Sequence, residues 1–207
     1  MVASQPAEKR YICIAGKSGA GKETAYQLLR KKMEAQGLTV SIHHFSDSLN
    51  EDLDRHRIPK HRKNQQNIST ILRTTVWYDN DGNPLSLDWS QEILSRTIQS
   101  DALDDRVNRV FLDGVRRPAD LVMLRNLPGS VLVGIERDAR LRHAGLRKRA
   151  DRPGDAEKTW EQFQEEQRAE TEQAIDQVVA SADLKIVNNG TPEDLDRELD
   201  KVLELLK

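Results

Sequence analysis

The sequence GKSGAGKE, residues 16–23, places two glycines and a lysine in the spacing Gly16-x-x-x-x-Gly21-Lys22. The apolar segment YICIA precedes it, and a segment with helical periodicity follows. A strand, a glycine-rich loop and a helix in this order are typical of a phosphate-binding loop, because backbone N–H groups and the helix N-terminus there face phosphate oxygens. We expect Lys22 to bridge the β- and γ-phosphates of a nucleotide. The expected nucleotide-binding loop is Gly16, Lys17, Ser18, Gly19, Ala20 and Gly21.

The residue after Lys22 departs from the usual pattern. Most such loops have Ser or Thr there, whose hydroxyl binds Mg²⁺, whereas this chain has Glu23 followed by Thr24. The Glu23 carboxylate either holds the hydration shell of the metal ion or points to solvent in the first helical turn, where the helix dipole favours a negative charge. A carboxylate beside a triphosphate is repelled unless a cation lies between them, so the first interpretation requires Mg²⁺. We expect Glu23 and Thr24 to lie at this metal ion, mainly through water.

An acidic residue and two arginines follow the apolar segment RVFL. Asp113 is expected at the end of a strand, where it would hold Mg²⁺ through water or orient a substrate hydroxyl. Arg116 and Arg117 come next, and their guanidinium groups suit bidentate binding of a phosphate. We expect them to act in catalysis and to bind the acceptor, and the sequence leaves open which of the two grips its phosphate.

Asp47 follows another apolar segment, in the sequence HFSD. At the carboxyl end of a strand it would face the same crevice, where it would accept a proton from a substrate or bind metal. The alternative is that Asp47 caps the helix that begins there, and the two roles are compatible.

Residues 137–152 carry seven basic side chains against two acidic ones. Arginines that close over a nucleotide stabilise the charge that develops on the γ-phosphate, so we interpret this segment as a lid. The expected phosphate contacts are Arg147, Arg149 and Arg152, with Arg149 in a catalytic role. The alternative is a basic helix neutralised by the acidic segment that follows it.

The expected positions of these residues depend on five apolar, β-rich segments: YICIAG, LTVSIHHF, RVFLDG, SVLVGIE and LKIVNN. Helical patterns separate them, which predicts right-handed crossovers and a five-stranded parallel sheet with helices on both faces. Such an α/β fold binds ligands at the carboxyl ends of its strands. One helix is expected to end at Gly37, and the last to begin with Thr191 as its N-cap.

We expect a single domain over residues 1–207, with its core in residues 10–45, 106–136 and 182–207. About sixty residues between the second and third strands fit no simple crossover, and they predict a mainly helical insert at about 46–105. The lid is expected at about 137–156. The sequence DNDGNP within the insert predicts a turn.

Composition limits the class of protein. The 207 residues are 37% hydrophobic, with a net charge of −2 and a pI near 6.2, which argues against general binding to nucleic acids or anionic membranes. Cys13 is the only cysteine, so no disulfide forms within the chain. No run of 18 apolar residues occurs, and we expect a cytoplasmic protein.

A resemblance adds to these inferences. GKSGAGKETA resembles the loop of the nucleoside monophosphate kinase superfamily, and the acidic Glu23 is similar to the Asp of phage-type deoxynucleoside monophosphate kinases and animal phosphomevalonate kinases. Further segments follow in the order seen in dephospho-CoA-kinase-like and adenylate-kinase-like proteins: FSDSLNEDL, FLDGVRRPAD, ARLRHAGLRKRADRP, WEQFQEEQRAETEQAI and SADLKIVNNG. The resemblance runs from Tyr11 onward and implies a three-layer P-loop kinase fold with an acceptor-binding insert and a lid.

The resemblance implies transfer of the γ-phosphoryl group of ATP, with Mg²⁺, to a small phosphate-bearing acceptor, foremost a nucleoside or deoxynucleoside monophosphate. It implies that Arg73 binds the acceptor and that Asn188 and Gly190 lie beside adenine; a solvated arginine and an Asn-Gly turn are the alternatives. A dephospho-CoA or phosphomevalonate kinase stays open, as does a nucleotide-binding switch or slow ATPase. The chain has no Asn-Lys-x-Asp run to read guanine, and it is expected to act as a monomer or homodimer.

Overall fold

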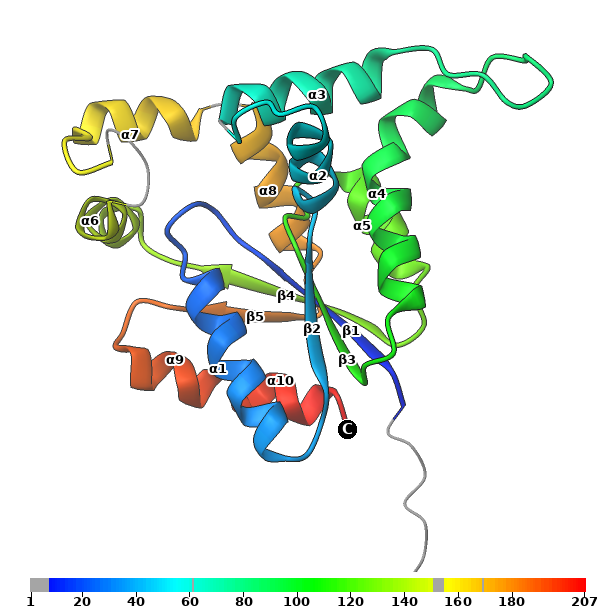
Figure 1. Cartoon of the computed structure of the whole chain (residues 1–207). Coiled ribbons are helices and arrows are strands. Elements are labelled where there is room, and N and C mark those ends of the chain that lie inside the picture. Colours follow the sequence, from blue (N-terminus) through cyan, green and yellow to red (C-terminus); the bar gives the residue numbers. More distant parts are fainter. Residues whose placement is uncertain (1–7, 61, 151–154, 169) are drawn as a thin grey trace, which may run out of the picture.

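A five-stranded, fully parallel sheet forms the centre of the computed structural model, which describes residues 8–60, 62–150, 155–168 and 170–207. The strands lie in the order β2-β3-β1-β4-β5 (Figure 1). Their bounds are Arg10–Ala15 (β1), Val40–His44 (β2), Arg109–Asp113 (β3), Ser130–Glu136 (β4) and Leu184–Val187 (β5). The predicted five-stranded parallel sheet is therefore confirmed, and its carboxyl-end edge collects the ends of β1, β2 and β3.

Alternation along β1 divides the core into two clusters. Tyr11 and Cys13 face one side of the sheet, while Ile12 and Ile14 face the other, and all four are buried. A strand buried on both faces reads as a continuous apolar run, which is why YICIA has no polar position. Polar side chains near β1 are therefore found in the loops at its two ends.

One face of the sheet is covered by α1 (Lys22–Ala35), α9 (Pro192–Glu198) and α10 (Asp200–Leu205), as Figure 1 shows. Gly37 has φ +79° just beyond α1, as expected for a glycine that ends a helix. Thr191 caps α9 by accepting a hydrogen bond from the Asp194 N–H, also as expected. The predicted last helix is divided at Leu199 into α9 and α10.

The opposite face is covered by α4 (Leu87–Asp104), α5 (Pro118–Arg125) and α8 (Glu170–Ala180) (Figure 1). Ile175, Val178 and Val179 of α8 are buried in this cluster. The core thus includes α8, which belongs to the part of the chain that the sequence analysis described only as an acidic segment. The reason is that its apolar positions, three and four residues apart, form a single stripe.

The first two helices of the predicted insert and the predicted lid segment lie beyond the carboxyl ends of the strands, whereas α4 packs on the sheet face. The insert comprises α2 (Asp47–Arg55), α3 (Arg62–Thr74) and α4, and the loop between α3 and α4 projects away from the sheet (Figure 1). The predicted turn at residues 79–84 is present, with Asp79 Oδ1 accepting hydrogen bonds from the Asp81 and Asn83 amides. The lid region contains α6 (Ala139–Arg149), followed by α7 (Trp160–Gln167). None of the described helices has the length and apolar character to cross a membrane.

Candidate active site

The loop between β1 and α1 has the conformation that its glycines predict. Gly19 and Gly21 have φ values of +79° and +101°, in the left-handed region that L-residues with side chains rarely adopt. At Gly19 a Cβ atom would also lie 2.9 Å from the Arg142 carbonyl oxygen. Lys22, the first residue of α1, donates a hydrogen bond from Nζ to the Gly16 carbonyl oxygen at 2.7 Å. The lysine therefore folds back over the loop, where a phosphate bound by the loop would meet it.

Side chains from distant segments hold this loop in place. Buried Asn188, after β5, donates from Nδ2 to the Ala20 carbonyl oxygen at 2.8 Å. Buried Arg142, in α6, donates from Nη1 to the Ser18 carbonyl oxygen at 3.2 Å. Lys17 pairs with Asp176 of α8 at 2.8 Å. The loop is thus fixed from the β5 end, from α6 and from α8.

A cavity of about 320 Å³, which we call the donor cavity, opens above the loop. Its lining contains four cationic side chains and four carboxylates: Lys22, Arg116, Arg149 and Lys158, and Glu23, Asp113, Asp155 and Glu166. Predicted residues that line it are Gly16, Ser18, Gly19, Gly21, Lys22, Glu23, Asp113, Arg116 and Arg149. Lysine and arginine side chains next to a glycine-rich loop suit a polyphosphate, and carboxylates beside them suit a cation bound to that polyphosphate.

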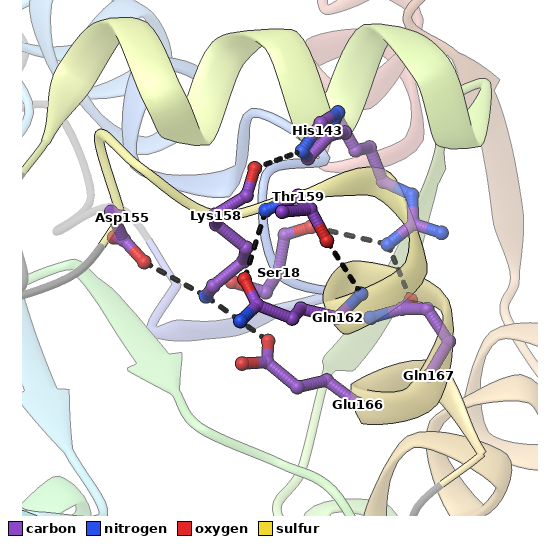
Figure 2. A network of polar contacts seen from close by, with 9 residues as sticks. Ser18, His143, Asp155, Lys158, Thr159, Gln162, Glu166 and Gln167 are labelled. Atoms are coloured by element: carbon purple, nitrogen blue, oxygen red, sulfur yellow. Dashed lines mark hydrogen bonds and ion pairs between the residues drawn. The ribbon is translucent and has the colours of Figure 1, made fainter.

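Lys158 is held at the rim of the donor cavity by two carboxylates. Its Nζ lies 2.9 Å from Asp155 Oδ1 and 3.1 Å from Glu166 Oε2, as Figure 2 shows. Gln167 in the same helix α7 accepts a hydrogen bond from Arg142 Nη1 at 2.6 Å, so Arg142 joins α7 to the loop residue Ser18. The lid region is therefore tied to the phosphate-binding loop through side chains that the sequence analysis did not single out.

Several expected nucleotide contacts are not part of the lining of the donor cavity, and their roles stay predictions. Asn188 is placed beneath the loop and Gly190 lies against Asp194, so neither lines the donor cavity. Arg147 is exposed and donates from Nε to the Ala156 carbonyl oxygen at 3.0 Å. Arg152 and residues 151–154 of the expected lid lie outside the described residues.

The donor cavity presents two carboxylates that suit a magnesium ion. Glu23 lines the cavity, and its Oε1 accepts a hydrogen bond from Gln27 at 2.8 Å. Asp113 lines the same cavity from the end of β3, whereas Thr24 is exposed and is not part of the lining. The described residues contain no group of three or more His, Cys, Asp or Glu side chains arranged to hold a metal ion. These residues therefore fit Mg²⁺ held mainly by phosphate oxygens and water, which is usual for this ion.

Asp113 and His44 form a polar pair at the ends of β3 and β2. His44 Nδ1 lies 3.1 Å from Asp113 Oδ2 because the strand register places these residues side by side. The hydrogen bond to Asp113 raises the pKa of His44 above its ordinary value, against the effect of burial. Burial also raises the pKa of Asp113, but the His44 hydrogen bond and the charge of Lys22 outweigh it, so that pKa is lowered. Asp113 is thus kept ionised beside the phosphate-binding loop.

A second cavity, of about 600 Å³, which we call the acceptor cavity, lies between the insert and the sheet edge. Three arginines line it: Arg73 from α3, and Arg116 and Arg117 from the turn after β3. The rest of the lining combines polar side chains of α3 with apolar ones, and includes Gln65, Gln66, Ser69, Thr70, Phe45, Leu49 and Leu94. The structure therefore brings the three predicted acceptor arginines to one cavity.

Arg73 is destabilised as a cation in the acceptor cavity. Burial lowers its pKa, the charge of Arg117 lowers it further, and Asp120 acts in the opposite direction. Its Nη1 donates to Ser69 Oγ at 2.5 Å, whereas its buried Nε has no hydrogen-bond partner among the described residues. Two guanidinium groups that repel each other in a partly enclosed space favour the binding of an anion between them.

Asp47 has a different position from the arginines. It is the first residue of α2, and its Oδ2 accepts a hydrogen bond from the His44 backbone N–H at 2.7 Å. It does not belong to the lining of the acceptor cavity. Ser46 is the N-cap of α2, and no side-chain hydrogen bond caps the helix, so Asp47 is not the N-cap either. Its bond to the His44 amide instead fixes the turn between β2 and α2.

The two cavities share one wall. Asp113, Gly114 and Arg116 line both of them, whereas Arg117 lines the acceptor cavity alone. A ligand on the phosphate-binding loop and a second ligand among the arginines would therefore meet at the turn after β3. Sequence analysis did not single out His44 or Asp120, although His44 lies within the predicted strand LTVSIHHF and Asp120 ends the quoted segment FLDGVRRPAD.

Two proteins of similar sequence match this chain over nearly their whole length. No protein-family model matches the chain. A "UPF0200 protein" of Hyperthermus butylicus is 26% identical over 200 residues, which covers 97% of this chain and 96% of that protein. "UPF0200 protein PH1008" of Pyrococcus horikoshii is 23% identical over 196 residues, covering 93% and 95% of the two chains.

Solved structures of kinases are similar over nearly the whole length. The shikimate kinase of Bacteroides thetaiotaomicron matches with a TM-score of 0.57 at 13% identity, covering 95% of this chain and 98% of that one. The APS kinase CysC of Mycobacterium tuberculosis, in complex with AMPPNP and APS, matches with a TM-score of 0.52 at 15% identity, covering 97% and 99%. At these identities the likeness shows the fold, and the chain has the P-loop kinase fold of these neighbours.

The Asp113–His44 pair predicts a specific titration. In metal-free protein, we expect NMR to show His44 titrating above the ordinary value of about 6.5, and Asp113→Asn to lower that pKa. A raised pKa in the folded state stabilises the protein below the unfolded-state pKa, and this contribution is lost as the pH rises through the folded-state pKa. Asp113→Asn should therefore reduce the loss of stability in that pH range.

A His44 pKa that Asp113→Asn leaves unchanged would show that the pair does not form in solution.

Proposed function

We propose that this protein is a P-loop kinase that transfers the γ-phosphoryl group of ATP to a small phosphate-bearing acceptor, foremost a nucleoside or deoxynucleoside monophosphate. The observation that carries the proposal is the shared wall of the two cavities at Asp113, Gly114 and Arg116. A triphosphate on the loop and an anion among the arginines would place a γ-phosphate and an attacking oxygen on either side of that wall. In-line transfer depends mainly on such positioning and on electrostatic stabilisation.

The donor side of the proposed reaction uses fixed positive charge. Lys22 and the loop N–H groups bind the β- and γ-phosphates, while Arg149 and Arg116 approach from the lid and from the turn after β3. Charge that develops on the γ-phosphate oxygens is stabilised by these groups without any rearrangement of solvent. Glu23 and Asp113 would hold Mg²⁺ through its water ligands, and the bound ion would neutralise phosphate charge.

The acceptor side uses Arg73 and Arg117 for the acceptor's phosphate. Both line the acceptor cavity, and neither lines the donor cavity, so we assign the acceptor phosphate to them and the transferred group to Arg116. A volume of about 600 Å³ suits a molecule of nucleotide size, and the polar face of α3 offers amide and hydroxyl groups to a base or sugar.

A phosphate-bearing acceptor also fits the acid–base groups of the site. A phosphate oxygen is already ionised near neutral pH, so its attack requires no general base. This leaves the Asp47 carboxylate free for its hydrogen bond to the His44 amide. Since Cys13 is buried and unpaired with another cysteine, we place the reaction in the reducing cytoplasm.

Acceptor-dependent release of ADP tests the proposal. ATP would be supplied with nucleoside and deoxynucleoside monophosphates, dephospho-CoA and phosphomevalonate in turn, and we expect a nucleoside monophosphate to raise ADP release. Lys22→Ala should lower turnover about a hundredfold, roughly 3 kcal/mol, because it removes a charge-assisted contact that is strongest in the transition state.

Lys31→Ala, on the exposed side of the same helix, is the matched control and should retain full turnover. ADP release that no acceptor raises would contradict the kinase and favour a slow ATPase. A response to dephospho-CoA alone would contradict the choice of a phosphate as the attacking group.

The role of Glu23 is tested by metal titration. Glu23→Gln keeps the shape of the side chain and removes its charge, so it should raise the Mg²⁺ concentration for half-maximal activity more than it raises the KM for ATP at saturating metal. Glu23→Thr should recover part of the loss by supplying the customary hydroxyl. If Glu23 points to solvent and only interacts favourably with the helix dipole, the curves of activity against Mg²⁺ concentration for wild type and Glu23→Gln will coincide at fixed free ATP.

A further inference from the structure

Asp120 contacts the turn that carries Arg116 and Arg117, and it also belongs to the lining of the acceptor cavity. It is in the first turn of α5, and only 3% of its surface is exposed. Its Oδ2 accepts two hydrogen bonds, from the backbone N–H groups of Arg116 and Arg117, each at 3.0 Å. One carboxylate oxygen therefore fixes the backbone of both arginines.

The second oxygen of Asp120 connects this turn to the insert. Ser95 of α4 donates from Oγ to Asp120 Oδ1 at 2.7 Å, and only 1% of Ser95 is exposed. The bond spans 25 residues of sequence and is fully buried. A buried carboxylate that accepts all three hydrogen bonds is well satisfied, so this arrangement is favourable and geometrically specific.

The arginines on this turn need accurate placement. Arg116 lines both cavities and Arg117 lines the acceptor cavity, so any rotation of the turn moves groups on both sides of the shared wall. A misplacement of about 1 Å in a site of this kind can cost a hundredfold in rate. Because Ser95 of α4 donates a hydrogen bond to Asp120, the position of the turn depends on how α4 packs against the sheet.

We propose that Asp120 is a positioning residue that fixes the placement of Arg116 and Arg117. Its hydrogen bond to Ser95 makes that placement depend on the position of α4 in the insert. The ligand assigned to these arginines rests on the function proposed above. The three hydrogen bonds of Asp120 are observed and do not depend on that function. The alternatives are a helix cap with no effect on ligand binding, and a purely electrostatic role of the negative charge.

Three variants separate these roles. Asp120→Ala removes the charge and all three hydrogen bonds, and Asp120→Asn removes the charge but keeps an oxygen for the two amides. Ser95→Ala removes only the link to α4. Asp194→Ala is the matched control, because Asp194 occupies the same third position in the capping box of α9 and accepts from the Thr191 N–H at 2.8 Å.

The measured quantity is the affinity for orthophosphate of protein saturated with AMPPNP and Mg²⁺, together with AMPPNP affinity and the free energy of unfolding. We expect Asp120→Ala to weaken orthophosphate binding tenfold or more, Asp120→Asn to retain most of it, and Ser95→Ala to fall between them. Ser95→Ala should add nothing in the Asp120→Ala background, because the two residues share one interaction. Asp194→Ala should lower stability and leave orthophosphate binding unchanged.

Each other outcome overturns the inference. Removing a negative charge near arginines should tighten anion binding, so equal tightening in Asp120→Ala and Asp120→Asn would establish the electrostatic role. Unchanged orthophosphate affinity in Asp120→Ala would establish a helix cap alone and leave the proposed kinase intact. If wild-type protein does not bind orthophosphate at all, the assignment of the acceptor phosphate to Arg73 and Arg117 is wrong, and the proposed function is contradicted as well. Should Asp120→Ala not fold, Ser95→Ala and Asp120→Asn decide the question by the same comparison.

Discussion

The turn after β3 is the constraint on which the rest of the site depends. Both faces of the central strands are buried, so charged groups can gather only where the parallel strands end. The turn from Asp113 to Arg117 forms one wall of the donor cavity and one wall of the acceptor cavity. A carboxylate and a guanidinium on the same short segment can therefore act on two ligands, and the distance between those ligands is set by the backbone.

Electrostatic cost explains why the acceptor cavity suits an anion. Burial and the charge of Arg117 both lower the pKa of Arg73, which means that the cationic form is disfavoured there. Opposite conditions hold at Asp113, where His44 and Lys22 favour the charged form of the carboxylate. The cavity thus holds positive charge that a bound phosphate would stabilise, next to a carboxylate that stays ionised.

Local patterns in the sequence predicted the strands, the phosphate-binding loop, the end of the helix at Gly37 and the cap at Thr191. Contacts between distant segments were not predictable in this way. His44 meets Asp113 only because β2 and β3 pair in one register, and Ser95 meets Asp120 only because α4 packs beside α5. Arg142 was grouped with the basic lid, but burial against the loop gives it a supporting role.

The shared wall is tested most directly by calorimetry on three arginine variants, with Mg²⁺–AMPPNP as one ligand and orthophosphate, added to AMPPNP-saturated protein, as the other. Arg149→Ala should weaken the binding of AMPPNP alone, and Arg117→Ala should weaken the binding of orthophosphate alone. Arg116→Ala should weaken the binding of both ligands. Each loss is expected to be about tenfold or more, as for a charge-assisted hydrogen bond. If Arg116→Ala weakens only one ligand, or neither, the two cavities do not meet at this turn and the account is contradicted.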